Sequence, residues 1–455
     1  MDDRTILFYT AIHILSWLII YRAVKGKIDP LDPYYFSTGL YMLIFVYGPW
    51  VWINRGQTSY QGISVMEYLP VASFVFNICF AVFSMFSIAK TPKWRLKKRL
   101  CFKEYSNNSF QEFLEDEITG GFIVRYGLIV FVGSLSLALL YYRMIGRSLI
   151  FMLTLGQGAD PMAGRSGVGI YFLGQFTRSA ISGLLLLFAY AKRNRFLIYI
   201  GAYLLGAVCI SSGSRNLAIC VVLSIVVYHY LQNHKRPKLT TILLGIVILY
   251  LFVGFIGIFR RIIKSGGDIQ LELITSEAMF GAFMYNIEIF FPFYTLVGYV
   301  NRGIMKIHWG LGLLNIPIQF IPHAIWKSKP ANLGLSGFEA MYGNSMGGAA
   351  YPNIGEFYYE FGIIGAIIGM AVFAIISQKM FSYAKITRNK LSMIEYSIFF
   401  GYVMQFICRG HFPSWAIDIV LMFGPLWILK WLLGRRYGIW LNQQQMNSDK
   451  LSEDL

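Results

Sequence analysis

One arginine, Arg215, lies in a tight turn between two apolar runs, in the segment CISSGSRNLAICVVL at 209–223. The glycine and serines of SSGSR are turn-forming residues that expose backbone N–H groups, and a helix that starts after them points its positive dipole end at the turn. An arginine, turn amides and a helix N-terminus together make an anion-binding site. The alternative is an interfacial arginine whose guanidinium reaches lipid headgroups, and the sequence leaves both open.

Further cationic residues fall in segments that the topology below places on the same side of the membrane as Arg215. They are Arg178 in GQFTRSAISG, Arg260 and Arg261 in GIFRRIIK, Lys329 in WKSKP and Arg409 in ICRGHF. Planar guanidinium groups suit phosphate oxygens, so this gathering predicts a site that holds a pyrophosphate without a metal ion. Arg178 lies inside an apolar run, where a charge costs at least ~2 kcal/mol and is either functional or paired. Pairing with a helix dipole or with an acid such as Asp418 is the structural alternative for Arg178.

Proton transfer requires a histidine or a carboxylate. The candidates on the same side are His308, His323 and His411 and the glutamates Glu272, Glu277, Glu339 and Glu356. In YPNIGEFYYEFGIIGAIIG, Glu356 falls in the first turn of an expected helix, and Glu360 follows on the same face. The helix dipole stabilises a glutamate in a first turn, so a role in starting the helix is the alternative for Glu356. The chain has no G-x-S-x-G, H-E-x-x-H or P-loop motif, and we expect a preactivated donor with no cofactor and no metal.

The composition is that of an integral membrane protein. Of 455 residues, 56% are hydrophobic and only 14% are charged, and repeated apolar runs are long enough to cross ~30 Å of hydrocarbon as helices. The net charge of +17 comes from short basic clusters between these runs. Clusters of this kind orient the helices of a membrane protein across the membrane and do not indicate nucleic acid binding. Four of the five cysteines lie in apolar runs, and their spacing fits neither a disulfide framework nor a zinc site.

We predict an all-α polytopic membrane protein with about eleven spanning helices. They lie near 5–21, 34–53, 68–90, 122–143, 170–191, 197–211, 215–231, 240–259, 354–377, 392–408 and 414–433. Alternate loops hold most of the lysines and arginines, which places the N-terminus outside and the C-terminus inside. The chain therefore divides into helices one to eight (1–259), a long external loop (260–353), helices nine to eleven (354–433) and a cytoplasmic tail (434–455). We expect the polar end of the tail, NQQQMNSDKLSEDL at 442–455, to be disordered.

The external loop is far longer than a connection between helices requires, which indicates that function lies there. Its apolar stretch at 278–300 is long enough for a twelfth span but contains Asn286, Glu288 and Pro292, and prolines interrupt the stretch at 310–326 that would have to return. We expect helices that lie on the outer face or dip into it, with two additional spans as the alternative.

The order of several short motifs resembles that of the oligosaccharide repeat-unit polymerases, the Wzy-type O-antigen and capsule polymerases. The motifs are SSGSRN before a spanning helix, the arginine pair after the next one, HWGLGLLNIPIQFIPHAIWKSKP in the long loop, PNIGEFYYEFGIIGAIIG and CRGHF. The resemblance covers roughly residues 120–430 and implies pyrophosphate-binding roles for Arg215, for Arg260 or Arg261, and for Arg409. Where the family pattern often has an arginine before the tryptophan, this chain has His323.

The resemblance also implies a glycosyltransferase of GT-C-like architecture on the outer face of the bacterial cytoplasmic membrane. Its donor would be the growing glycan on undecaprenyl pyrophosphate, and its acceptor a new undecaprenyl-pyrophosphate-linked unit. Arginines would stabilise the leaving pyrophosphate, and Trp326 and Tyr358 are candidates for stacking on sugars. A chain-length regulator is a candidate partner. The alternatives are a ligase of the same superfamily, which moves finished glycan to another acceptor, and a transporter that flips the lipid-linked unit.

Overall fold

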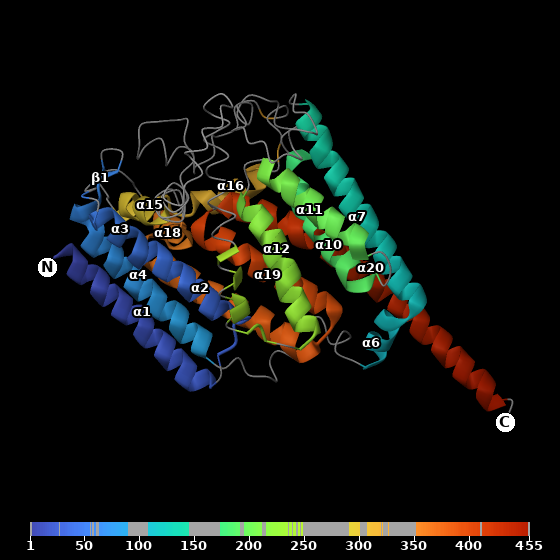
Figure 1. Ribbon diagram of the computed structural model, residues 1–455. Coiled ribbons are helices and arrows are strands. Elements are labelled where there is room, and N and C mark those ends of the chain that lie inside the picture. The colour runs from blue at the N-terminus through green and yellow to red at the C-terminus, as the bar shows by residue number, and fades with distance from the viewer. Residues whose placement is uncertain are drawn as a thin grey trace.

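The protein is a bundle of membrane-length helices, seen in a computed structural model (Figure 1). The structure describes residues 2–26, 28–54, 56, 59–60, 63–89, 108–144, 173–191, 195–211, 215–234, 236–238, 240–242, 244–245, 247–248, 291–300, 307–319, 321, 326, 352–409 and 412–453. In these residues the regular elements are helices, apart from one short antiparallel pair of strands, β1 (Ser59–Tyr60) and β2 (Ile63–Ser64). The predicted all-α class is therefore confirmed.

The helices follow one another along the described part of the chain. They are α1 (Asp3–Lys25), α2 (Pro33–Met42), the π-helix η1 (Leu43–Tyr47), α3 (Gly48–Asn54), α4 (Val65–Ile88), α6 (Asn108–Glu115), α7 (Glu117–Met144), α10 (Thr177–Tyr190), α11 (Arg195–Ser211), α12 (Arg215–Gln232), α15 (Phe291–Val300), α16 (Leu311–Gln319), α18 (Asn353–Thr387), α19 (Lys390–Cys408) and α20 (Phe412–Glu453). Side-chain caps fix several starts: Asp32 accepts from the Tyr34 N–H before α2, and Asn389 from the Leu391 N–H before α19.

Seven helices in the described part of the chain are long and apolar enough to cross a membrane: Asp3–Lys25, Pro33–Asn54, Met66–Ile88, Glu117–Met144, Asn353–Thr387, Lys390–Cys408 and Phe412–Trp440. Each coincides with one of the eleven predicted spans. Three more predicted spans coincide with the shorter helices α10, α11 and α12. Most of the predicted span at 240–259 lies outside the described residues, so the total of eleven stays a prediction.

The two ends of the bundle are held by separate groups of contacts. At one end, Glu356 in the first turn of α18 accepts a hydrogen bond from the Phe412 N–H at the start of α20, and Arg178 in the first turn of α10 pairs with Asp418 of α20. We call this the Glu356 end. At the opposite end, Asp29 in the loop between α1 and α2 pairs with Lys385 near the end of α18. We call this the Asp29 end.

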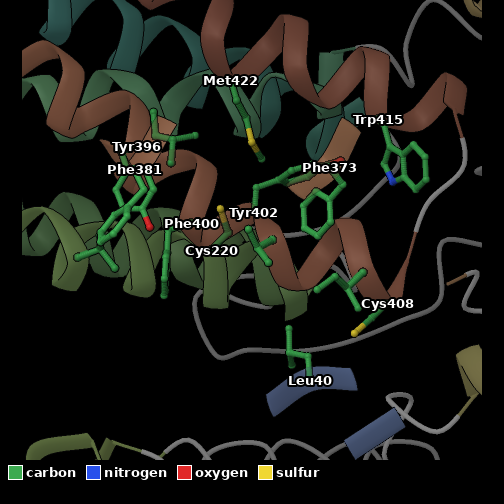
Figure 2. Packing of buried hydrophobic residues seen from close by; sticks show 14 of the residues in the cluster. Leu40, Cys220, Phe373, Phe381, Tyr396, Phe400, Tyr402, Cys408, Trp415 and Met422 are labelled. Carbon is green, nitrogen blue, oxygen red and sulfur yellow. The ribbon is translucent and has the colours of Figure 1, made fainter. Parts of the chain in front are cut away.

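The core between these ends is built from close helix pairs. Side chains from α2, α12, α18, α19 and α20 meet there, among them Cys220, Phe373, Tyr402 and Trp415 (Figure 2). A glycine lets α12 and α19 approach each other closely, because a Cβ at Gly401 would lie 2.7 Å from the carbonyl oxygen of Cys220. Small residues at helix crossings bring membrane helices into tight packing.

The described parts of the long loop pack against the bundle. In α15, Phe293, Leu296 and Val297 are fully buried, and the helix contacts α4 and α18. The residues before α15, 278–290, lie outside the described part of the chain, so the helices expected on the outer face stay a prediction.

The tail differs from the sequence-based expectation. The last helix, α20, continues to Glu453 and extends away from the bundle toward the C-terminus (Figure 1). The prediction that the polar end at 442–455 is disordered is therefore wrong for residues 442–453. No proline or glycine follows Gly438, so nothing in the sequence interrupts the helix that the last span begins.

Candidate functional site

The helix α18 is broken near its start, and the break organises the Glu356 end. Gly362 has φ +67° and ψ −158°, a conformation that is open essentially to glycine alone. In a continuous helix the carbonyls of Tyr359 and Glu360 would accept from the fourth residue along. Here they accept instead from the backbone N–H of His308 at 3.0 Å and of Gly310 at 3.2 Å. The break therefore attaches the long loop to the first turns of α18.

The Glu360 carboxylate makes a second attachment to the same loop. Its side chain is 1% exposed, and Oε2 accepts from the Gly312 N–H at 3.0 Å in the first turn of α16. A negative group at this position is stabilised by the unpaired amides and dipole of the helix start. A Cβ at position 312 would collide with the Glu360 carboxylate, and a Cβ at Gly310 would lie 2.8 Å from the Phe361 ring. The glycines of HWGLGL thus make room for α18.

The Glu356 carboxylate lies one turn earlier and binds a different helix. It is 3% exposed, and Oε1 accepts from the Phe412 N–H at 3.0 Å. This N–H is the first of α20, so Glu356 caps α20 as Glu360 caps α16. Two carboxylates at i and i+4 therefore join three helices, α16, α18 and α20, at one end of the bundle.

A histidine and a tyrosine form a pair beside these carboxylates. The Nε2 atom of His308 lies 2.5 Å from the Tyr359 hydroxyl, and the ring centroids are 4.1 Å apart. Which atom donates depends on the histidine tautomer. Burial lowers the pKa of His308, so its neutral form dominates at neutral pH. The other ring nitrogen, Nδ1, has no hydrogen-bond partner in the described part of the chain.

Arg178 belongs to a second cluster that reaches the same end. Its Nε donates to Asp418 Oδ1 and its Nη1 to Gln175 Oε1, while the Tyr402 hydroxyl donates to Asp418 Oδ2 at 2.7 Å. The side chains of Arg178 and Asp418 are 17% and 3% exposed. Removal of either partner would leave a buried charge unpaired, which is strongly destabilising. Pairing with an acid such as Asp418 is the structural alternative that the sequence indicated for Arg178, and this is the arrangement that the structure has.

The first turns of α20 connect the two clusters. Phe412, which binds Glu356, and Asp418, which binds Arg178, are six residues apart and therefore about 9 Å apart along one helix. Arg409, which ends α19, precedes Phe412 by three residues, and its N–H donates to the Gln405 carbonyl. The start of α12 lies at this end too, because Cys220, five residues after Arg215, packs on Gly401 near the end of α19.

Comparison with known protein families identifies the family of the chain. The family model described as O-antigen polysaccharide polymerase Wzy matches residues 5–437, nearly the whole chain. The chain belongs to this family. Neither the curated proteins nor the solved structures contain a match to it. The family resemblance predicted from the order of the motifs is thereby confirmed, and it covers more of the chain than the motifs do.

The structure describes six of the eleven residues that the sequence proposed for this Wzy-family site. Glu356, Arg178 and Arg409 lie at the Glu356 end, as does the backbone of Arg215, the first residue of α12. Tyr358 is 6% exposed and packs in the core, whereas Trp326 is 37% exposed. The other candidates lie outside the described residues: Arg260, Arg261, His323, Lys329 and His411.

The structure brings Glu360, Tyr359 and His308 together around the break. The sequence predicted His308 as a candidate for proton transfer but gave Glu360 no site role. The available signal was the spacing of the two glutamates, which places them on one face of a helix. Their partners come from other segments and could not be read from that spacing. In the described part of the chain no group of three or more His, Cys, Asp or Glu side chains could hold a metal ion.

Proposed function

We propose that this protein polymerises lipid-linked oligosaccharide repeat units on the outer face of the bacterial cytoplasmic membrane. The donor is the growing glycan on undecaprenyl pyrophosphate, and the acceptor is the non-reducing-end sugar of a new undecaprenyl-pyrophosphate-linked unit. The observation that carries the proposal is the match of the O-antigen polysaccharide polymerase family over 5–437. The gathering of Glu356, Arg178 and Arg409 at one end of the bundle supports placing the reaction there.

In the proposed reaction, the bond between the donor's anomeric carbon and its pyrophosphate oxygen breaks. The acceptor hydroxyl oxygen forms a new bond to that carbon and gives its proton to a general base. Negative charge develops on the departing pyrophosphate, where fixed arginines stabilise the transition state more than the ground state. We assign this role to Arg215, Arg260, Arg261, Arg409 and Lys329, and we propose that no metal or cofactor takes part.

Glu356 is the one proposed general base whose surroundings lie in the described part of the chain. Its Oε1 accepts from the Phe412 N–H, and a carboxylate has a second oxygen that can accept from an acceptor hydroxyl. The hydrogen bond to the start of α20 fixes the carboxylate in one orientation, as general base catalysis requires. His323 and His411 are the further candidates for proton transfer.

Arg178 and the aromatic candidates take supporting positions in this proposal. Arg178 is tied to Asp418, so it contributes positive charge from a fixed place beside the start of α20. Trp326 is the more exposed of the two proposed sugar contacts, and Tyr358 lies next to Tyr359 in the first part of α18. A chain-length regulator is a proposed partner. Eleven spans with GT-C-like architecture complete the proposal.

The proposal is tested in a strain that lacks the chain and is complemented with variants. Deletion should leave single repeat units and remove long glycan. Arg215→Ala should lower elongation at least about 100-fold, the effect of removing one donor aimed at developing charge. Arg215→Lys should restore little, because an ammonium cannot reproduce the planar guanidinium fork.

The matched control is Arg435→Lys, which changes an exposed arginine stacked on Trp431 near the Asp29 end. It should give normal chains. Membrane levels of each variant are measured by immunoblotting. Normal long chains in the deletion strain would refute the polymerase assignment, and full-length glycan with well-expressed Arg215→Lys would refute the role of Arg215.

A further inference from the structure

A cavity lies at the Asp29 end, away from the candidate site. Its volume is about 250 Å³, and besides Tyr230 its polar lining consists of Asp29, His234, Arg236, Lys385 and Arg388. These residues come from the loop between α1 and α2, from the segment that follows α12, and from the end of α18. Taking ~30 Å³ per water molecule, the space equals about eight waters, which is enough for a phosphate group with its ester substituents.

The lining carries more positive than negative charge. Asp29 is 6% exposed and is the carboxylate of the cavity; it pairs with Lys385, and Arg236 Nε lies 3.9 Å away. Arg388 has no carboxylate partner in the described part of the chain. Three permanent cations thus face one acid, and His234 adds charge when protonated. The ends of α12 and α18 bring about half a negative charge each, which leaves the cavity positive.

The backbone at two of these residues is also unusual. Arg388 has φ +50° and His234 has φ +52°, so both lie in the left-handed region that favours glycine or asparagine at helix ends. Each follows the end of a helix, α18 and α12 respectively, and each lines the cavity. Glycine would end both helices with less strain, so the ends of the helices do not explain why arginine and histidine occupy these two positions.

We propose that this cavity binds the phosphate of a negatively charged phosphate ester. Arginine guanidinium groups match phosphate oxygens in paired hydrogen bonds. Apolar side chains complete the lining, including Leu31, Leu231 and Met393, so the cavity accommodates a headgroup together with the start of its acyl region. Basic pockets between membrane helices are sites for anionic lipid headgroups. The same chemistry would also hold a soluble phosphate ester, and the experiment separates the two sources.

The test uses the purified full-length chain in a neutral detergent and follows thermal unfolding. Four probes are added separately: phosphatidylglycerol, phosphatidylcholine, sn-glycerol 3-phosphate and inorganic phosphate. Arg388→Gly removes the cation and relieves the left-handed backbone, so the variant should unfold no earlier than wild type without a probe. Lys379→Gln is the matched control, since it removes an exposed cation of the same helix that does not line the cavity.

We expect phosphatidylglycerol to raise the unfolding temperature of wild type and of Lys379→Gln at the same lipid concentration. Arg388→Gly should need about tenfold or more lipid for the same rise, the effect of losing one charge-assisted contact. Phosphatidylcholine should have no effect. A response to the soluble phosphates that Arg388→Gly also weakens would support the site with a soluble ligand. Equal responses of Arg388→Gly and Lys379→Gln to every probe, or no response of wild type, would overturn the proposal.

Discussion

The break of α18 at Gly362 leads to the most specific prediction that the structure allows. Its backbone breaks α18 and turns the carbonyls of Tyr359 and Glu360 toward His308 and Gly310. The substitution Gly362→Ala adds a Cβ in a conformation that only glycine adopts readily. It should favour a continuous helix and detach the long loop from the first turns of α18, while the rest of the bundle stays folded.

The size of the effect follows from two contributions. A non-glycine residue in this conformation costs about 1–3 kcal/mol, and alanine gains about 1 kcal/mol over glycine inside a helix. Together they shift the balance by roughly 2–4 kcal/mol toward the continuous helix, or about 30-fold to several hundredfold in population. The added Cβ would also lie 3.3 Å from Ile307 Cδ1, which is tight contact. Elongation should fall by at least about 30-fold if it requires the broken form.

The assay is the ladder of lipid-linked glycan formed by membranes that contain equal amounts of each variant. The control is Gly133→Ala, because Gly133 lies within α7 with open space around its Cβ position and should tolerate alanine. Size-exclusion chromatography in detergent verifies that both variants are folded. A wild-type rate for well-folded Gly362→Ala would show that the break and the loop contacts it makes are not needed for elongation.

Two further predictions concern packing and metal dependence. Gly401→Ala should lower the stability in detergent by about 1–3 kcal/mol, the usual cost of overpacking, because its Cβ would lie 2.5 Å from Ser224 Oγ. The control Gly424→Ala should not lower it, because the Cβ position of Gly424 has open space around it. Equal unfolding temperatures of the two variants would contradict the close packing of α12 and α19. The purified enzyme should elongate lipid-linked units in EDTA, since arginines take the place of a divalent ion at the pyrophosphate. Complete loss of activity in chelator, restored by magnesium or manganese, would contradict the proposed site.

The positions of the long helices could be predicted from the sequence alone. An apolar run of about 20 residues is a strong signal, because hydrocarbon requires the backbone to satisfy its own hydrogen bonds. The first predicted span, at 5–21, corresponds to the helix Asp3–Lys25, and the span predicted at 392–408 corresponds to the helix Lys390–Cys408. The differences lie at the ends, where caps and polar residues extend a helix beyond its apolar part.

The break in α18 could not be predicted in the same way. In the segment GEFYYEFGIIGAIIG, aromatic and aliphatic residues directly flank Gly362, and the further glycines at 365 and 369 remain helical. Nothing local distinguishes the one glycine that adopts a positive φ. What distinguishes it is the pair of backbone N–H groups at 308 and 310, which belong to a segment about fifty residues earlier. They donate hydrogen bonds to the carbonyls of Tyr359 and Glu360.

The same limit applies to the charged residues of the site. The sequence correctly placed Glu356 in a first turn and suggested stabilisation by the dipole of its own helix, but the carboxylate caps α20, 56 residues later. The partner of Arg178 is 240 residues away, and Asp418 was one named possibility among several. Spacing along a helix decides which side chains share a face, whereas the partner of each depends on which helix packs there. Glu356 and Glu360 show the difference, because two carboxylates on one face bind the starts of two different helices, and that division of partners is what joins the long loop to the end of the bundle.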